Sequence, residues 1–151
     1  MKKLTILLMG AALAIGTTAC KKKGCTDELA ENVSKEAQKD DGSCTYLSDR
    51  LVGTYSVAQS CYYDGESSYT MQVLDGSNKG VIILQNLDNS VDVQATISGA
   101  QFTFKEDKAG ITYEGSGYMV GDSQITINLE ICETYYYPCS DPESCTLTLT
   151  K

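Results

Sequence analysis

The stretch that decides the fold is Gln124-Ile125-Thr126-Ile127-Asn128-Leu129-Glu130-Ile131-Cys132. Isoleucine or leucine occupies every second position, and polar side chains fill the positions between them. Because successive side chains of a β-strand point to opposite faces, this alternation predicts a strand with one apolar face and one water-facing face. Such a strand needs other apolar surface to pack against, and the rest of the chain must supply it.

Runs with the same period of two recur through the C-terminal two thirds of the chain. They contain no proline, and turn residues such as Asp64-Gly65 and Asp75-Gly76 separate them. Turns this short join antiparallel neighbours. The pattern predicts eight strands, at Thr54–Gln59, Ser68–Leu74, Val81–Asn86, Val91–Ile97, Gln101–Lys105, Ile111–Met119, Gln124–Cys132 and Cys145–Thr150.

Strands with one apolar face each require a single shared interior. We therefore expect residues 50–151 to form an all-β domain, an eight-stranded antiparallel up-and-down barrel, with a β-sandwich as the alternative. Phe102, Phe104 and Met71 should point inward and fill most of the interior. Gly115 and Gly117 are the positions where space for a small apolar ligand could open.

The first twenty residues have the layout of an export signal. Lys2-Lys3 is followed by an apolar run, Leu4 to Gly16, that is too short to span a membrane. Thr17-Thr18-Ala19-Cys20 then resembles the lipobox of bacterial lipoproteins. The resemblance implies a signal peptide over residues 1–19, lipidation of Cys20 and a tether over residues 20–24. Ordinary secretion with cleavage after Ala19 is the alternative.

Composition agrees with an exported protein. Seven cysteines would be unusual in the cytosol, and removing Cys20 from the count leaves an even number that can pair. Loss of Lys2 and Lys3 with the signal peptide would leave 10 basic against 20 acidic side chains, a net charge of −10. A surface this acidic repels the phosphate backbone of nucleic acids, and no nucleic-acid partner is therefore expected. We expect a lipid anchor in the bacterial cell envelope, at the outer membrane.

A cysteine-bounded segment, residues 25–46, precedes the strands. Gly24-Cys25-Thr26-Asp27 and Asp40-Asp41-Gly42-Ser43-Cys44 resemble a module of bacterial surface proteins, Gly-Cys-Thr-Asp-Pro-x-Ala-x-Asn-Tyr followed by Asp-Asp-Gly-Ser-Cys. Glu28, Val33 and Lys35 depart from it. We expect a Cys25–Cys44 disulfide around a helical or loop segment, with Leu29, Val33 and Ala37 forming one apolar stripe of a short helix.

Three carboxylates of this segment are weak calcium candidates. Asp27, Asp40 and Asp41 could supply oxygen ligands, but the spacing of a twelve-residue calcium loop is absent. Solvated carboxylates around a turn are the favoured interpretation.

The ends of the strand-rich domain carry a second resemblance. Gly53-Thr54-Tyr55 resembles the Gly-x-Trp start of lipocalin-like barrels, with Tyr55 in place of tryptophan. The domain is similar to small lipocalin-like domains of bacterial lipoproteins, which begin Gly-Thr-Tyr and end on a cysteine-led, threonine-rich strand like Cys145–Lys151. In a closed barrel the first and last strands are neighbours, so we expect disulfides Cys61–Cys145 and Cys132–Cys139.

The sequence lacks the parts of common active sites. Without histidine there is no Ser-His or Cys-His couple, and without histidine or a Cys-x-x-Cys pair a zinc site is not expected. No phosphate loop or dinucleotide motif is present. Glu114 and Glu130 are the only acids inside long strands, and we expect both to face solvent. The chain is therefore not expected to be an enzyme or to hold a cofactor.

Binding is the remaining class of function. The segment Cys132–Cys139 concentrates three tyrosines between two cysteines, and an ordered loop of this kind offers flat amphipathic surface at low entropic cost. We expect Tyr135, Tyr136 and Tyr137, with Tyr62 and Tyr63 at the same end, to contact an envelope protein or a glycan. Tyrosines that merely cover the barrel mouth are an equal possibility. The alternative function is carriage of a small apolar ligand inside the barrel.

Overall fold

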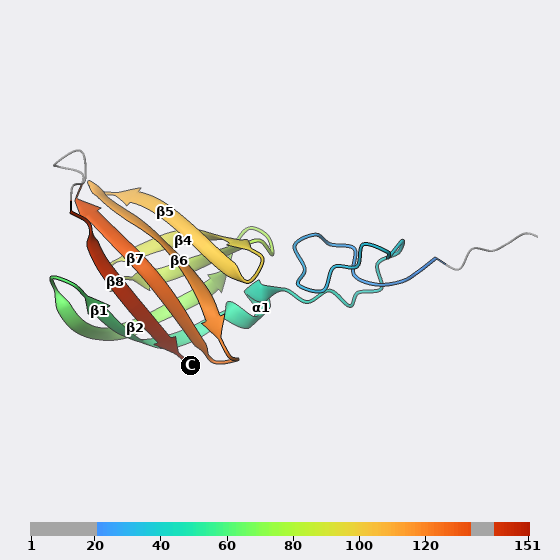
Figure 1. The fold of residues 1–151 in the computed structure, drawn as a ribbon, viewed down its shortest axis with the longest axis horizontal. Coiled ribbons are helices and arrows are strands. Elements are labelled where there is room, and N and C mark those ends of the chain that lie inside the picture. The colour runs from blue at the N-terminus through green and yellow to red at the C-terminus, as the bar shows by residue number, and fades with distance from the viewer. Residues whose placement is uncertain (1–20, 134–140) are drawn as a thin grey trace, which may run out of the picture.

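The computed structural model describes residues 21–133 and 141–151, and Figure 1 shows its fold. A short helix, α1 (Leu47–Leu51), precedes eight strands. Each strand coincides with one predicted from the sequence, or extends it by up to three residues at either end. The strands are β1 (Gly53–Cys61), β2 (Gly65–Asp75), β3 (Val81–Leu87), β4 (Val91–Ser98), β5 (Gln101–Lys108), β6 (Ile111–Val120), β7 (Gln124–Glu133) and β8 (Glu143–Thr150).

The strands form one closed barrel. Each pairs antiparallel with its neighbours in the chain, and β8 pairs back onto β1, where Val57 lies opposite Leu149. The up-and-down barrel predicted from the sequence is confirmed, and the alternative sandwich is wrong. The ladders are shortest between β2 and β3 and between β4 and β5, with four residue pairs each.

The alternation of β7 places its apolar side chains in the core. Ile125, Ile127 and Leu129 are fully buried, while Asn128 and Glu130 at the alternate positions are exposed. The inward positions of the other strands complete the cluster, including Tyr55, Met71, Leu84, Phe102 and Leu147. Burying an aliphatic or aromatic side chain of this size contributes about 1.5–3 kcal/mol, so this interior is the main source of stability.

Helix α1 closes one end of the barrel, which we call the base. Leu47 and Leu51 insert into the core, and the Tyr55 hydroxyl donates to the carbonyl oxygen of Leu51 at 2.6 Å. The Lys151 ammonium lies 5.3 Å from the centroid of the Tyr55 ring and also donates to the Arg50 carbonyl. Tyr55, which stands where lipocalin-like barrels have tryptophan, thus links helix α1 to the first strand and to the C-terminal residue of the chain.

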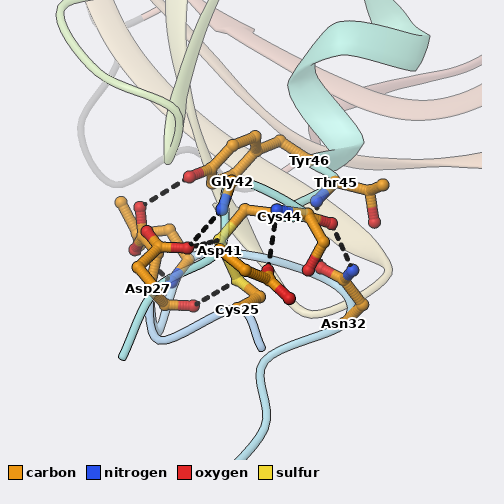
Figure 2. The surroundings of a disulfide bond; sticks show 11 residues. Cys25, Asp27, Asn32, Asp41, Gly42, Cys44, Thr45 and Tyr46 are labelled. Carbon is orange, nitrogen blue, oxygen red and sulfur yellow. Dashed lines mark hydrogen bonds between the residues drawn. A yellow bond between two sulfur atoms is a disulfide. The ribbon is translucent and has the colours of Figure 1, made fainter. Parts of the chain in front are cut away.

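The cysteine-bounded module adjoins the base and contains no helix within its described residues. The predicted helix over Asp27–Ala37 is wrong, and the loop alternative holds: the segment is a series of turns closed by the Cys25–Cys44 disulfide, with Cα atoms 4.8 Å apart. The Asn32 side chain donates to the Ser43 carbonyl and accepts from the Thr45 amide (Figure 2). Asn and Asp side chains that bond the backbone in this way favour turns over helix.

Contacts between the module, α1 and the turns at the base hold these parts together. The Arg50 guanidinium pairs with Glu31 at 3.1 Å and with Asp122 of the β6–β7 turn at 3.6 Å. Lys79 of the β2–β3 turn pairs with Asp49 of α1, and its ammonium lies 5.8 Å from the Tyr46 ring centroid. The module therefore continues the barrel away from its base, as Figure 1 shows.

Candidate binding site at the stapled end of the barrel

The end of the barrel opposite the base is fastened by a disulfide, and we call it the stapled end. Cys61 closes β1 and lies directly opposite Cys145 in β8. The two cysteines form a disulfide with their Cα atoms 4.1 Å apart, which is the pairing that the sequence predicts. The bridge holds the β1–β2 hairpin against the start of β8, two segments separated by 84 positions in the chain.

The hairpin presents two tyrosines to solvent. Tyr62 is 80% exposed and Tyr63 is 58% exposed, and their rings meet edge to face with centroids 4.7 Å apart. Edge-to-face packing of this kind is favourable for aromatic quadrupoles. The pair therefore forms a compact, exposed aromatic surface at the tip of the hairpin.

Hydrogen bonds to the start of β8 position these tyrosines. The Tyr63 hydroxyl donates to Asp141 Oδ2 at 2.6 Å, and the Tyr63 amide donates to Glu143 Oε1 at 2.8 Å. The Tyr62 amide donates to the Ser144 carbonyl at 3.1 Å. The bond to the Asp141 carboxylate raises the pKa of the Tyr63 hydroxyl above its ordinary value.

The described residues that flank the predicted tyrosine loop lie at this end. Tyr135, Tyr136, Tyr137 and Cys139 lie outside the described residues, as do the predicted signal peptide, residues 1–19, and Cys20. The described residues on either side of the loop, Glu133 at the end of β7 and Asp141 before β8, are at the stapled end. Tyr62 and Tyr63 lie at this end too, and the Tyr63 hydroxyl donates to Asp141.

A partly buried polar network lies just inside the stapled end, and the sequence analysis missed it. The Tyr69 hydroxyl donates to Gln59 Oε1 at 2.8 Å, and Gln59 Nε2 donates to Asp88 Oδ1 at 2.7 Å. The Asp88 amide in turn donates to the Tyr69 hydroxyl at 2.9 Å. Burial raises the pKa of Tyr69 to about 12. The available signal was Gln59 itself, a polar residue at an inward position between Val57 and Cys61.

The space expected at the glycines of β6 is occupied by aromatic rings. Gly115 lies opposite Phe104 and Gly117 opposite Phe102 in the β5–β6 pair. A Cβ atom at Gly117 would lie 2.7 Å from Cε2 of Phe102, and one at Gly115 would lie 2.6 Å from Cζ of Phe104. Each phenylalanine ring lies against the glycine across from it. The space that the glycines leave is therefore filled by these rings.

The three calcium candidates of the module are used by the protein itself. Asp27 accepts from the Leu29 amide and the Tyr46 hydroxyl, Asp40 from the Gly42 amide and Asp41 from the Ser43 amide (Figure 2). The Leu29 amide bond and then the Tyr46 bond lower the pKa of Asp27, and bonds from Ser43 lower that of Asp41. These carboxylates stabilise turns.

The remaining candidates for chemistry are a cluster around the disulfide and two exposed carboxylates. Among the described residues, the one cluster of three potential metal ligands is Cys61, Glu143 and Cys145, and the disulfide already uses two of them. Glu114 and Glu130 lie opposite each other on the outer face of the β6–β7 pair, exposed as predicted. Lys105 Nζ pairs with Glu114 Oε2 at 2.6 Å. Within the described ranges no helix is long and apolar enough to cross a membrane.

Comparison with known proteins supports the fold. No family model matches the sequence, and no curated protein matches it. Among solved structures, EF1p2_mFAP2b bound to DFHBI is similar, with a TM-score of 0.51 and 15% identity over 68% of this chain and 94% of that chain. A redesigned β barrel matches at 0.51 and 13% identity, covering 71% of this chain and 98% of its own. Another redesigned barrel, mFAP1 bound to DFHBI, matches with a TM-score of 0.50 and 18% identity. The match covers 71% of this chain and 100% of that chain. Together with the strand order, these likenesses define the class as a closed eight-stranded antiparallel barrel.

Proposed function

We propose that this protein is an exported lipoprotein, anchored at Cys20 in the bacterial cell envelope, that binds an envelope protein through the stapled end of its barrel. The observation that carries the proposal is the exposed pair Tyr62 and Tyr63, held in place by Asp141 and Glu143 and by the Cys61–Cys145 bridge. Aromatic side chains fixed in this way bind at low entropic cost and are enriched at protein interfaces.

The arrangement of the chain suits a tethered binder. The module leaves the barrel at its base, and the hairpin with Tyr62 and Tyr63 lies at the opposite end (Figure 1). An anchor at Cys20 would therefore direct the stapled end away from the bilayer. The acidic composition also favours a domain held clear of the bilayer, because an acidic surface is repelled by anionic lipid.

The absence of catalytic motifs supports binding in place of catalysis. The chain has no histidine, and Glu114 is paired with Lys105 on the exposed outer wall. General acid–base catalysis needs a positioned side chain with a pKa near the working pH, usually in a site shielded from bulk water. The polar groups of the stapled end instead hydrogen-bond each other and hold the tyrosines.

Carriage of a ligand in the barrel is the second candidate. It is favoured by the two similar barrels that are described as bound to DFHBI. The rings of Phe102 and Phe104 stand against it, because they occupy the space beside Gly117 and Gly115. A ligand would have to displace packed side chains.

Site-specific crosslinking in living cells tests the proposal. A photo-crosslinking amino acid in place of Tyr62 should give a discrete adduct with an envelope protein, and the same amino acid in place of Val120 should not. Val120 is a matched control because it is 44% exposed and lies at the base. Adding Tyr63→Ser should remove the adduct while the melting temperature stays nearly unchanged. Equal labelling from both positions would refute the proposed interface.

The anchor needs its own experiment. Cys20→Ala should abolish lipid labelling and move the protein from the membrane to the soluble envelope fraction. A wild-type chain that is exported without lipid would overturn the anchoring part of the proposal and leave the binding part open to the crosslinking result.

A further inference from the structure

The outer wall of the barrel contains a hollow that the proposed function does not use. It has a volume of about 740 Å³ and lies across β4 to β8. Five outward side chains form one cross-strand row through it, each directly opposite the next. These are Thr96, Thr103, Ser116, Asn128 and Thr146. With neighbouring strands about 4.8 Å apart, the row extends over roughly 19 Å, which is long enough for an elongated ligand.

The row is uncharged and rich in hydrogen-bonding groups. Each of its side chains carries a hydroxyl or an amide, so each can both donate and accept. Within the described residues, none of the five makes a side-chain hydrogen bond to the protein, in contrast to the bonded tyrosines and carboxylates of the stapled end. Sugar hydroxyls have the same dual character and are the natural complement of such a row.

The charges beside the row exclude other occupants. Lys105 and Glu114 neutralise each other at 2.6 Å, and Glu130 leaves the hollow with one net negative charge, which disfavours anions. Along the row each strand is paired with the next, so an extended peptide cannot add a strand there. Recognition must therefore come from side chains, and a neutral polyhydroxylated ligand fits them best.

An exposed aromatic ring lies next to the row. Tyr118 follows Ser116 by two positions in β6, so it points outward on the same face, about 7 Å further along the strand. Its side chain is 41% exposed. Beyond Thr146 the wall continues into a second hollow of about 500 Å³, lined by Ser60 and Ser68 among others. We propose that the row and the Tyr118 ring form a binding site for a neutral oligosaccharide, with the ring as its stacking platform.

Amide chemical-shift mapping of the isotopically labelled full chain tests this site. The probes are linear oligosaccharides of glucose, of galactose and of N-acetylglucosamine, each titrated to millimolar concentration. At least one should shift the amides along the row. The double variant Thr103→Val with Thr146→Val keeps the shape of the wall and removes two hydrogen-bonding hydroxyls, so affinity should fall about thirtyfold.

The control uses the same chemistry elsewhere on the wall. Thr54→Val with Thr70→Val changes two exposed threonines that lie outside both hollows and should leave affinity unchanged. Tyr118→Ala should weaken binding without lowering the melting temperature. The inference is overturned if none of the three probes shifts the row, if the shifts centre on the stapled end, or if both double variants lose affinity equally. Because the stapled end is untouched, the crosslinking result at Tyr62 is independent.

Discussion

Substituting Gly117 by alanine should expose how tightly the barrel interior is filled. The added Cβ would lie 2.7 Å from Cε2 and 2.9 Å from Cε1 of Phe102, and closer still to Cζ. Phe102 is fully buried, and its ring is enclosed by the rest of the core. The ring therefore cannot move aside without displacing neighbours, unlike a flexible side chain at the surface.

The size of the effect follows from two opposing terms. Overpacking a well-filled core costs typically about 1–3 kcal/mol of the free energy of unfolding. Replacing glycine by alanine within a strand returns roughly 0.5–1 kcal/mol, because glycine loses more backbone entropy on folding. The net destabilisation expected for Gly117→Ala is therefore about 1–2 kcal/mol.

A double-mutant cycle isolates the contact. Urea unfolding with the disulfides intact should be measured for Gly117→Ala, for Phe102→Leu and for the two together. Because leucine lacks the ring atoms that the new Cβ would meet, Gly117→Ala should cost little in the Phe102→Leu background. The coupling energy should then be about 1 kcal/mol or more.

Additive behaviour would refute the reasoning. If the two changes add within about 0.5 kcal/mol, the Phe102 ring does not fill the space over Gly117. The interior at that level would then have room for a ligand, and carriage would become the better of the two proposed functions.

Three further predictions concern the disulfide and the titrating groups. Changing Cys61 and Cys145 together to serine should lower stability by about 4–5 kcal/mol in the chain-entropy model, measured by denaturant unfolding. Burial raises the pKa of Tyr55 and Tyr69 from 10.0 to about 12. Their contribution to the free energy of unfolding is therefore complete below pH 10 and is lost as pH rises toward 12. Ultraviolet titration should show that these two tyrosines ionise late and together with unfolding. The pKa of Asp27 is lowered from 3.8, so its stabilisation of the module is present above that pH and is lost below it, and a carboxyl NMR titration with a midpoint at or above 3.8 would contradict this.

The barrel could be predicted because its information is local and repeated. Alternation as regular as that of residues 124–132 fixes which side chains face inward, and short turns leave antiparallel neighbours as the simplest connection. Closure then followed from the need for one shared interior, and it placed Cys61 opposite Cys145. Each of these steps depends on strand period and chain order, which a single sequence contains.

The features that sequence reasoning missed depend on side-chain geometry across distant segments. The network of Gln59, Tyr69 and Asp88 joins three segments. The inward position of Gln59 signals a polar group inside the barrel, but no spacing in the chain identifies its partners. In the module, the stripe of Leu29, Val33 and Ala37 has a helical period, yet Asn32 and the disulfide close the segment into turns. In the sequence, the residues of the row on the outer wall are only the polar positions of five separate strands. The pairing register of the barrel places them side by side.

The packing of the interior and the location of the binding surfaces are linked. Strand pairing closes the barrel, and Phe102 and Phe104 fill the inner face opposite the two glycines. Burying such a ring contributes about 1.5–3 kcal/mol, so a ligand inside would first have to offset that loss for each ring that it displaced. What remains available at low cost is surface that folding has already ordered. The stapled hairpin with Tyr62 and Tyr63 and the outward row through Ser116 are both of this kind, because their backbones are fixed whether or not a partner is present.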